Sequence, residues 1–305
     1  MEKIRHHRTP VQIVQLVLMY LFVSVGAFVC LYPLIFTVMA GFFSYEEFAA
    51  DLTGMSLFPI ADSPTFENFL AIFDGGSEVS VAFLNSLLRT AYMTVCSLIT
   101  SFIPGYVFAR LNFRGRNALF MFLLATVMLP STITLIPTYI MYARWPFAGG
   151  NFIFTGGQGI LDTFWIYIVG GPVINVMGTF IVMQSFDKIP REMDEAAKID
   201  GAGTAALLWH VLLPMQVPIL TYVMVTTAIS VWNDWMTPFY FTTSPELATL
   251  PGAITKLSSK MNGYLVPNYP LMITLGLAIT IPCLIIFFFF QRFIVEGLSN
   301  AGLKD

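Results

Sequence analysis

The sequence predicts an all-α polytopic membrane protein with six transmembrane helices and a polar helical hairpin on the cytoplasmic side. Composition is the first observation, because the 305-residue chain is 56% hydrophobic and 11% charged, whereas soluble proteins average about 25% charged residues. The second observation is a set of six apolar stretches, each longer than the roughly 20 residues that cross about 30 Å of hydrocarbon. They cover 11–43, 83–109, 119–142, 163–185, 216–241 and 270–290. The third is an uneven distribution of Lys and Arg over the connections.

The first apolar stretch follows a short basic segment, 1–10. A cleavable signal has an apolar region of only about 7–15 residues, so the longer stretch 11–43 is expected to remain as the first span, with a bend at Pro33. The next segment, 44–82, holds seven Asp or Glu and no Lys or Arg, and is expected to be extracytoplasmic. Spans two to six then form one core, followed by a short tail, at 83–292 and 293–305.

Prolines and glycines interrupt two of the later spans. The third span contains Pro130 and Pro137, and the fourth contains Gly170, Gly171 and Pro172. Within a membrane such residues are tolerated where neighbouring helices satisfy the freed backbone groups. These spans are therefore expected to be kinked and packed against their neighbours.

The positive charges predict the orientation. With a cytoplasmic N-terminus, eleven of the fifteen Lys and Arg residues fall in inner segments and four in outer ones, and cytoplasmic connections carry the excess of positive charge. Both termini and the polar connection 187–214 are therefore expected on the cytoplasmic side.

The connection 187–214 has the pattern of two short helices joined by a turn. Pro190 suits a first helical position, and acidic residues then crowd the first turns, where the helix dipole favours negative charge. Lys198 and Gly201 fit the end of that helix, and a second helix is expected from near 203 to Pro214. On charge pattern alone, the simplest interpretation is an ordinary solvated loop helix.

The spacing within this connection resembles a known family. Glu195-Ala196-Ala197, then Gly201, then Leu213-Pro214 is similar to the EAA loop of bacterial ABC importer permeases. Further segments resemble the carbohydrate-uptake group, the relatives of the shorter permease subunit of the maltose transporter. They are Leu84–Thr90, Ala109–Arg116, Met128–Pro130, Leu135–Pro137, Trp232–Asp234 and Gln291–Leu298.

The resemblance implies a type I ABC importer permease in a bacterial inner membrane. In that family an extracytoplasmic binding protein delivers a saccharide to a pair of permeases, commonly two different ones. Separate ATPase subunits, which bind ATP-Mg, drive alternating access, so this chain would be non-catalytic and would hold no cofactor itself. The resemblance assigns coupling with the ATPase to Glu195, Ala196, Ala197, Asp200, Gly201, Leu213 and Pro214.

Four of these coupling residues have an expected physical role. Small side chains at Ala196 and Ala197 would allow close helix packing, and Gly201 would permit the turn between the two helices. Glu195 is expected to cap or pair locally.

Asp234, beside Asn233, is an acid within an apolar stretch, and such residues raise the hypothesis of a translocation path or outer gate. At 1.5 Å per residue it lies roughly 27 Å along its span, near the outer end. There it can instead be structural and pair with Arg89. Trp232 is a third candidate for the path, although it and Trp235 suit an interfacial aromatic belt better than a sugar platform.

Other polar positions leave two interpretations open. Asn175 and Gln184 in the fourth span face either a polar lumen or a neighbouring helix. The outer connection 242–269 either contacts the binding protein, as in the maltose-type relatives, or is a plain connector, and the acidic segment 44–82 leaves the same choice. The residues expected to make the receptor contact are Lys256, Lys260 and Asn262.

Other functional classes lack the residues that they need. His6, His7 and His210 form no zinc-binding pattern, and the glycines of the tail do not complete a nucleotide-binding motif. The three cysteines fall in apolar segments and predict no disulfide framework, and a net charge of -3 offers no basic face for nucleic acid. A secondary, ion-coupled transporter is the alternative, although it would show internal repeats and charges near the bilayer midplane. A membrane enzyme would need a catalytic constellation, which the sequence does not contain.

Overall fold

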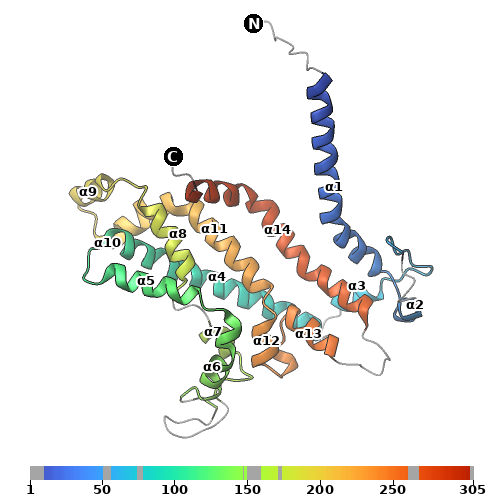
Figure 1. Ribbon diagram of the computed structural model, residues 1–305. Helices are drawn as coiled ribbons and strands as arrows, with labels where there is room; N and C mark the ends of the chain where they lie inside the picture. The colour runs from blue at the N-terminus through green and yellow to red at the C-terminus, as the bar shows by residue number, and fades with distance from the viewer. Residues whose placement is uncertain are drawn as a thin grey trace. The chain divides into compact units, whose positions relative to one another are not determined.

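Figure 1 shows the computed structural model, in which the described residues are 10–50, 56–73, 78–146, 148–149, 159–170, 174–259 and 268–302. Regular structure in this part of the chain is helical throughout, which confirms the predicted all-α class. The chain divides into two compact units. One consists of Met1–Ile72 with Lys260–Ala278, and the other of Phe73–Ser259 with Ile279–Asp305.

The first unit begins with the long helix α1, Pro10–Ala40, which corresponds to the predicted first span and continues through Pro33. Its apolar side chains are almost all exposed as far as Leu31, as expected for a helix that contacts lipid, and several become half-buried toward Ala40. The unit also contains two short helices and the beginning of the last helix: α2 (Tyr45–Ala50), α3 (Glu67–Phe73) and α14 (Tyr269–Gly302).

A small core holds the first unit together. Phe43 and Phe48 are buried beside the last residue of α1. The side-chain amide of Asn68 donates hydrogen bonds to the carbonyls of Gly41, at 3.0 Å, and Phe43, at 2.8 Å. The first part of the predicted extracytoplasmic segment therefore folds onto the end of α1.

The second unit is built around one long helix, α4, Glu78–Arg110. It packs against α8, Val176–Phe186, and α11, Leu213–Trp232 (Figure 1). Its buried face carries small residues at helical spacing, namely Ala82, Ser86, Thr90, Ser97, Ser101 and Gly105.

Glycines set the distance between α4 and α8. A Cβ atom on Gly105 would come within 2.6 Å of Val182 Cγ1, and one on Gly178 would collide with the Ser101 hydroxyl. Small residues on both helices therefore allow the close approach that is common between membrane helices.

The predicted third span is bent. Its two halves, α5 (Arg116–Val127) and α6 (Ser131–Ala143), meet at an angle of 98°. The break falls at Pro130, which lacks a backbone N–H and disfavours helical geometry at the residue before it. A kink was expected here, but its size was not.

The predicted fourth and fifth spans are each divided. In the fourth, α7 (Trp165–Val169) is separated from α8, and residues 171–173 lie outside the described part of the chain. In the fifth, α11 ends at Trp232 and a separate helix, α12 (Met236–Phe241), follows. The reason is that Asp234 Oδ1 accepts hydrogen bonds from the backbone N–H groups of Met236, at 3.0 Å, and Thr237, at 3.2 Å, which starts a new helix.

The sixth span is longer than predicted. A 3₁₀ turn, Pro245–Leu247, and a helix, α13 (Leu250–Ser259), precede it, and α14 extends through the expected tail to Gly302. Among the described residues, four helices are long and apolar enough to cross a membrane, or five if the bent pair α5–α6 counts as one span. Membrane-spanning helices are thus confirmed, and the number six stays a prediction because α7 and α8 are individually short.

Candidate functional site

The hairpin predicted between residues 187 and 214 is present. Its first helix, α9, spans Glu192–Ile199, and its second begins with α10, Thr204–Ala206. Gly201 joins them at φ 84°. The Gly201 N–H donates to the Lys198 carbonyl, at 3.0 Å, and the Ala202 N–H donates to the Ala197 carbonyl, at 2.9 Å. These two bonds form a Schellman motif, which requires the left-handed glycine.

Two predicted boundaries of the hairpin are wrong. The first helix begins at Glu192, after Pro190, because the Arg191 carbonyl is the first to accept two following N–H groups. The second helix does not end at Pro214, since a π-helical segment, Leu207–Leu212, runs directly into α11. Wider π-type hydrogen bonding is suited to this position because the proline has no N–H to donate. The second arm of the hairpin is therefore continuous with α11.

The expected coupling residues divide into two groups. Glu195, Ala196, Asp200, Gly201 and Pro214 are exposed. Ala197 and Leu213 are half-buried and pack against the core of the same chain, a buried cluster that includes Phe186, Leu207 and Leu212. Within the described residues the Glu195 carboxylate makes no hydrogen bond or ion pair, so the expected local pairing is absent and this charge is available to a partner.

An ion pair that sequence reasoning missed fastens α9 to α4. Arg110 Nε lies 3.3 Å from Asp194 Oδ2, and both side chains are largely buried, at 6% and 12% exposure. Arg110 Nη2 also donates to the Ile189 carbonyl at 2.7 Å. Arg110 ends the long helix α4, so this contact ties the hairpin to the helix around which the unit is built. The signal available in the sequence was a basic residue closing one span and an acidic one opening the hairpin.

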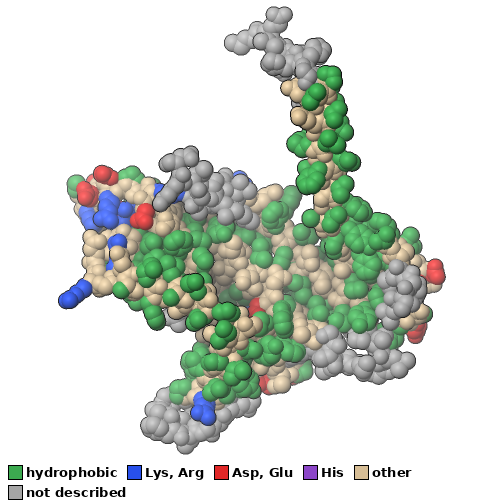
Figure 2. Space-filling model, viewed as in Figure 1, with side chains coloured by type: hydrophobic (Ala, Val, Ile, Leu, Met, Phe, Trp, Pro, Cys, Tyr) green, Lys and Arg blue, Asp and Glu red, His purple; other side chains and the backbone are tan. Residues whose placement is uncertain are grey.

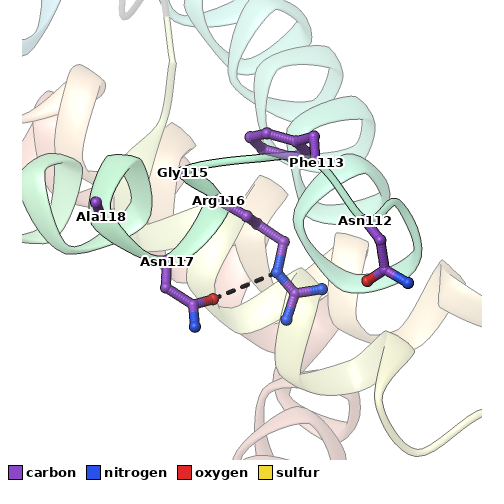
Figure 3. Close-up of a pocket in the computed structure, with 6 residues that line it drawn as sticks. All are labelled: Asn112, Phe113, Gly115, Arg116, Asn117 and Ala118. Atoms are coloured by element: carbon purple, nitrogen blue, oxygen red, sulfur yellow. Dashed lines mark hydrogen bonds between the residues drawn. The ribbon is translucent and has the colours of Figure 1, made fainter.

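Charged side chains gather at this end of the unit. Figure 2 shows Lys, Arg, Asp and Glu side chains around α9, whereas hydrophobic side chains cover much of the remaining visible face. The turn between α4 and α5 contributes a shallow pocket of about 350 Å³. In Figure 3 the side chains of Asn112, Arg116 and Asn117 point to one side of that turn, and Arg116 Nε donates to Asn117 Oδ1 at 3.4 Å.

In the first half of α4, Arg89 pairs with Asp234, as the structural interpretation predicted. Asp234 Oδ2 also accepts a hydrogen bond from Thr237 Oγ1 at 2.6 Å. The Arg89 guanidinium lies 5.1 Å from the centre of the Tyr167 ring. Both charged residues border a cleft of about 420 Å³, but their charges compensate each other and are engaged within the chain.

Trp232 and Asn233, the other two residues expected near the translocation path, differ in their exposure. Trp232 is 3% exposed, and its indole N–H donates to the Ile279 carbonyl at 2.9 Å, so the expected interfacial position is wrong. The hydrogen bond to Ile279 of α14 draws the Trp232 ring inward, and the ring packs between α11 and α14. Asn233 is exposed, and its amide donates to the Ile229 carbonyl at 2.8 Å. Trp235 is 44% exposed, which suits the predicted belt.

A polar network crosses the middle of the second unit. Asn175 Nδ2 donates to Ser97 Oγ at 2.5 Å, and Ser97 Oγ lies 2.9 Å from Thr227 Oγ1. Asn175 therefore contacts a neighbouring helix and also borders a cleft between the helices, so both of the positions considered for it apply, whereas Gln184 is exposed. Of the expected receptor contacts, Lys260 and Asn262 lie outside the described residues, as does the Lys256 side chain.

Asp162 fastens the loop before α7 to the segment after α12. It has φ 55°, and its Oδ1 accepts hydrogen bonds from the backbone N–H groups of Thr243, at 2.7 Å, and Ser244, at 2.8 Å. Its Oδ2 accepts a third, from Ser244 Oγ, at 2.7 Å. Burial alone would raise the pKa of Asp162, but the bonds from Ser244 and Thr243 outweigh it and lower the pKa from 3.8 to about 2.

We expect this fastening to weaken in acid. Because the pKa of Asp162 is lower in the folded chain than in the unfolded one, its contribution is complete above pH 3.8 and is lost as the pH falls toward about 2. The measurement is the rate of pepsin cleavage within residues 242–249, divided by the rate at a second pepsin site in the chain. This ratio should rise as the pH falls from 3.8 toward about 2. Asp162→Asn tolerates the positive φ but lacks the charge, so residues 242–249 of this variant should be cleaved quickly at both ends of this pH range. A flat ratio in the parent chain would contradict this assignment.

Comparison with known proteins gives concordant matches. A family model described as "Binding-protein-dependent transport system inner membrane component" matches residues 97–300. The chain is similar to the arabinooligosaccharides transport system permease protein AraQ of Bacillus subtilis (strain 168), with 26% identity over 240 residues, 79% of either chain. It is also similar to the galactooligosaccharides transport system permease protein GanQ of the same strain, with 27% identity over 297 residues, 95% of this chain and 96% of the other.

The fold has a counterpart among solved structures. A chain of a bacterial ABC transporter involved in the import of the acidic polysaccharide alginate superposes with a TM-score of 0.75, covering 93% of this chain and 98% of that one. At 19% identity, this similarity bears on the fold alone.

Proposed function

Because the chain belongs to the family of binding-protein-dependent transport system inner membrane components, in which it is an ABC importer permease, we propose that it lines the translocation path for a sugar or oligosaccharide. A second permease forms the other side of the path, and an extracytoplasmic binding protein delivers the saccharide. The arabinooligosaccharide and galactooligosaccharide relatives support this substrate class.

The observation that carries the proposal is the hairpin. Glu195 and Ala196 are exposed on a short rigid helix, and the second arm continues through a π-helical segment into α11. A contact that differs between two states of a partner can bias a conformational equilibrium, and a rigid helix transmits such movement as a unit. The hairpin therefore couples the chain to separate ATPase subunits, which hold the ATP-Mg, and the chain itself is not catalytic.

The topology follows from the same assignment. The bent pair α5–α6 and the divided pair α7–α8 count as the third and fourth of six spans, with both termini and the hairpin on the cytoplasmic side of the inner membrane. The excess of Lys and Arg in the inner segments supports this orientation. The outer connection 242–269 contacts the binding protein, through Lys256, Lys260 and Asn262.

Co-purification tests the proposal directly. The tagged chain is isolated from its native membrane in mild detergent, and its partners are identified by mass spectrometry. We expect an ATPase, a second permease and a binding protein, and we expect uptake by the reconstituted complex to require ATP. Isolation of this chain alone, with uptake driven by an ion gradient, would instead establish the alternative of a secondary transporter.

A further inference from the structure

A cleft of about 530 Å³ lies between α4, α8 and α11 in the second unit and is bordered by the end of α5. Its back wall is the polar network of Ser97 of α4, Asn175 at the N-cap of α8 and Thr227 of α11, in which Ser97 is fully buried. Asn175 is held further, because its Oδ1 accepts a hydrogen bond from the Gly178 N–H at 2.9 Å. The wall is thus a fixed array of hydroxyl and amide groups.

One face of α11 supplies the open side of the cleft. Tyr222, Thr226 and Ser230 follow each other at intervals of four residues, which places them on the same face. Thr226 Oγ1 donates to the Tyr222 carbonyl at 2.9 Å and keeps its oxygen free to accept. Ser230 is exposed, and among the described residues its hydroxyl has no partner, so it can both donate and accept.

The cleft is uncharged. None of the described residues that line it is Lys, Arg, His, Asp or Glu. Arg89 and Asp234 border a second cleft, which shares Met93 with this one, and they pair with each other. A carboxylate that entered would lose hydration without gaining a cation, and an uncompensated charge in such surroundings costs several kcal/mol.

We propose that this cleft is a subsite for a neutral saccharide and disfavours an acidic one, an inference that rests on the proposed function. Saccharide hydroxyls both donate and accept hydrogen bonds, as the exposed hydroxyl of Ser230 can, and the exposed Thr226 and half-buried Asn175 add further polar groups. The Tyr222 ring offers an apolar surface with a polar edge. A solved importer of the acidic polysaccharide alginate shares the fold, so the fold alone does not exclude an acidic saccharide, and the uncharged lining of this cleft is the feature that does so here.

The test places a charge in the cleft of the whole complex, reconstituted with its ATPase, second permease and binding protein. Ser230→Cys is introduced into a chain whose own cysteines, Cys30, Cys96 and Cys283, are replaced by serine. One sample is modified with a sulfonate-bearing methanethiosulfonate and another with a hydroxyl-bearing reagent of equal length. The probes are a mixture of neutral galacto- and arabino-oligosaccharides and a mixture of oligogalacturonates.

We expect the unmodified complex to take up the neutral mixture and to exclude the uronates. The sulfonate adduct should lower neutral uptake by about tenfold or more, because it puts an unpaired charge in the cleft, while the hydroxyl adduct should lower it far less. Gln184→Cys, an exposed position outside the cleft, serves as the matched control, and its sulfonate adduct should leave uptake unchanged.

Two results would overturn the inference while sparing the proposed function. The first is uptake of the uronates by the unmodified complex. The second is an equal loss of neutral uptake with the sulfonate and the hydroxyl adducts of Ser230→Cys. In both cases the binding protein must still stimulate ATP hydrolysis in the same vesicles. Absence of ATP-driven uptake of both mixtures in the unmodified complex would instead remove the proposed function and this inference with it.

Discussion

Replacement of Gly201 by proline is expected to abolish ATP-driven uptake while the chain still inserts into the membrane. Gly201 has φ 84°, and proline is fixed near -65°. The Gly201 N–H also donates to the Lys198 carbonyl, and proline has no N–H to replace it. The substitution therefore opens the turn that joins α9 to the helix leading into α11, and movement of the ATPase no longer reaches that span.

Uptake in proteoliposomes, set against the amount of inserted chain, measures the effect. The matched control is a pair of alanine variants, because a Cβ at either Gly201 or Gly203 meets no other atom within 4 Å. Gly203 has φ -69°, so Gly203→Ala should transport normally. Gly201→Ala forces a left-handed residue, at about 1–2 kcal/mol, and should lose part of its activity. Normal uptake by Gly201→Pro would exclude the hairpin from coupling.

A carboxylate at Ala197 is expected to abolish uptake by another route. Sequence resemblance assigns this residue to coupling with the ATPase, and its small side chain packs closely, as expected, against the chain's own core near Leu207 and Leu212. A charge there would be desolvated without a partner, and α9 would separate from the bundle. Ala196 is exposed, so an acidic residue at that position tests contact with the partner instead.

Local chemistry made the hairpin predictable. Lys198 followed by Gly201 marks the turn at the end of the first helix without knowledge of any distant contact. The limits of the spans were less predictable, because apolar composition is the same on both sides of a break. Pro130 predicted a kink, but the 98° angle between α5 and α6 depends on what these two helices pack against. Asp234 broke the fifth span through hydrogen bonds to Met236 and Thr237 that hydropathy does not register.

Contacts between residues far apart in sequence were the least predictable feature. The pairing of Arg89 with Asp234 was anticipated, since a buried acid needs a cation and few were available. The cleft was not anticipated, because Ser97, Thr226 and Ser230 are unremarkable polar residues within apolar helices. Only the packing of α4, α8 and α11 brings these hydroxyls around one cleft. A functional site made of common residues from several helices has no sequence signature.

The pairing of Arg110 with Asp194 leads to the second prediction of large effect. Breaking a buried ion pair by removing one partner typically costs about 3–5 kcal/mol, because the remaining charge has no counterion. Arg110→Ala and Asp194→Ala should each release α9 from the end of α4. We expect uptake to fall by at least about tenfold in each variant, while ATP hydrolysis by the partner subunits continues but no longer responds to the binding protein.

A double-mutant cycle separates this role from a general loss of stability. If the two residues act as one contact, the double alanine variant should be no worse than the worse single variant, because both unpaired charges are then gone. The exchange of the two residues, Arg110→Asp with Asp194→Arg, should recover part of the uptake. Arg114→Ala, at an exposed position in the following turn, should behave like the parent chain. Additive losses in the double variant would mean that the residues act separately, and the hairpin would then be held to α4 by apolar packing and not by this pair.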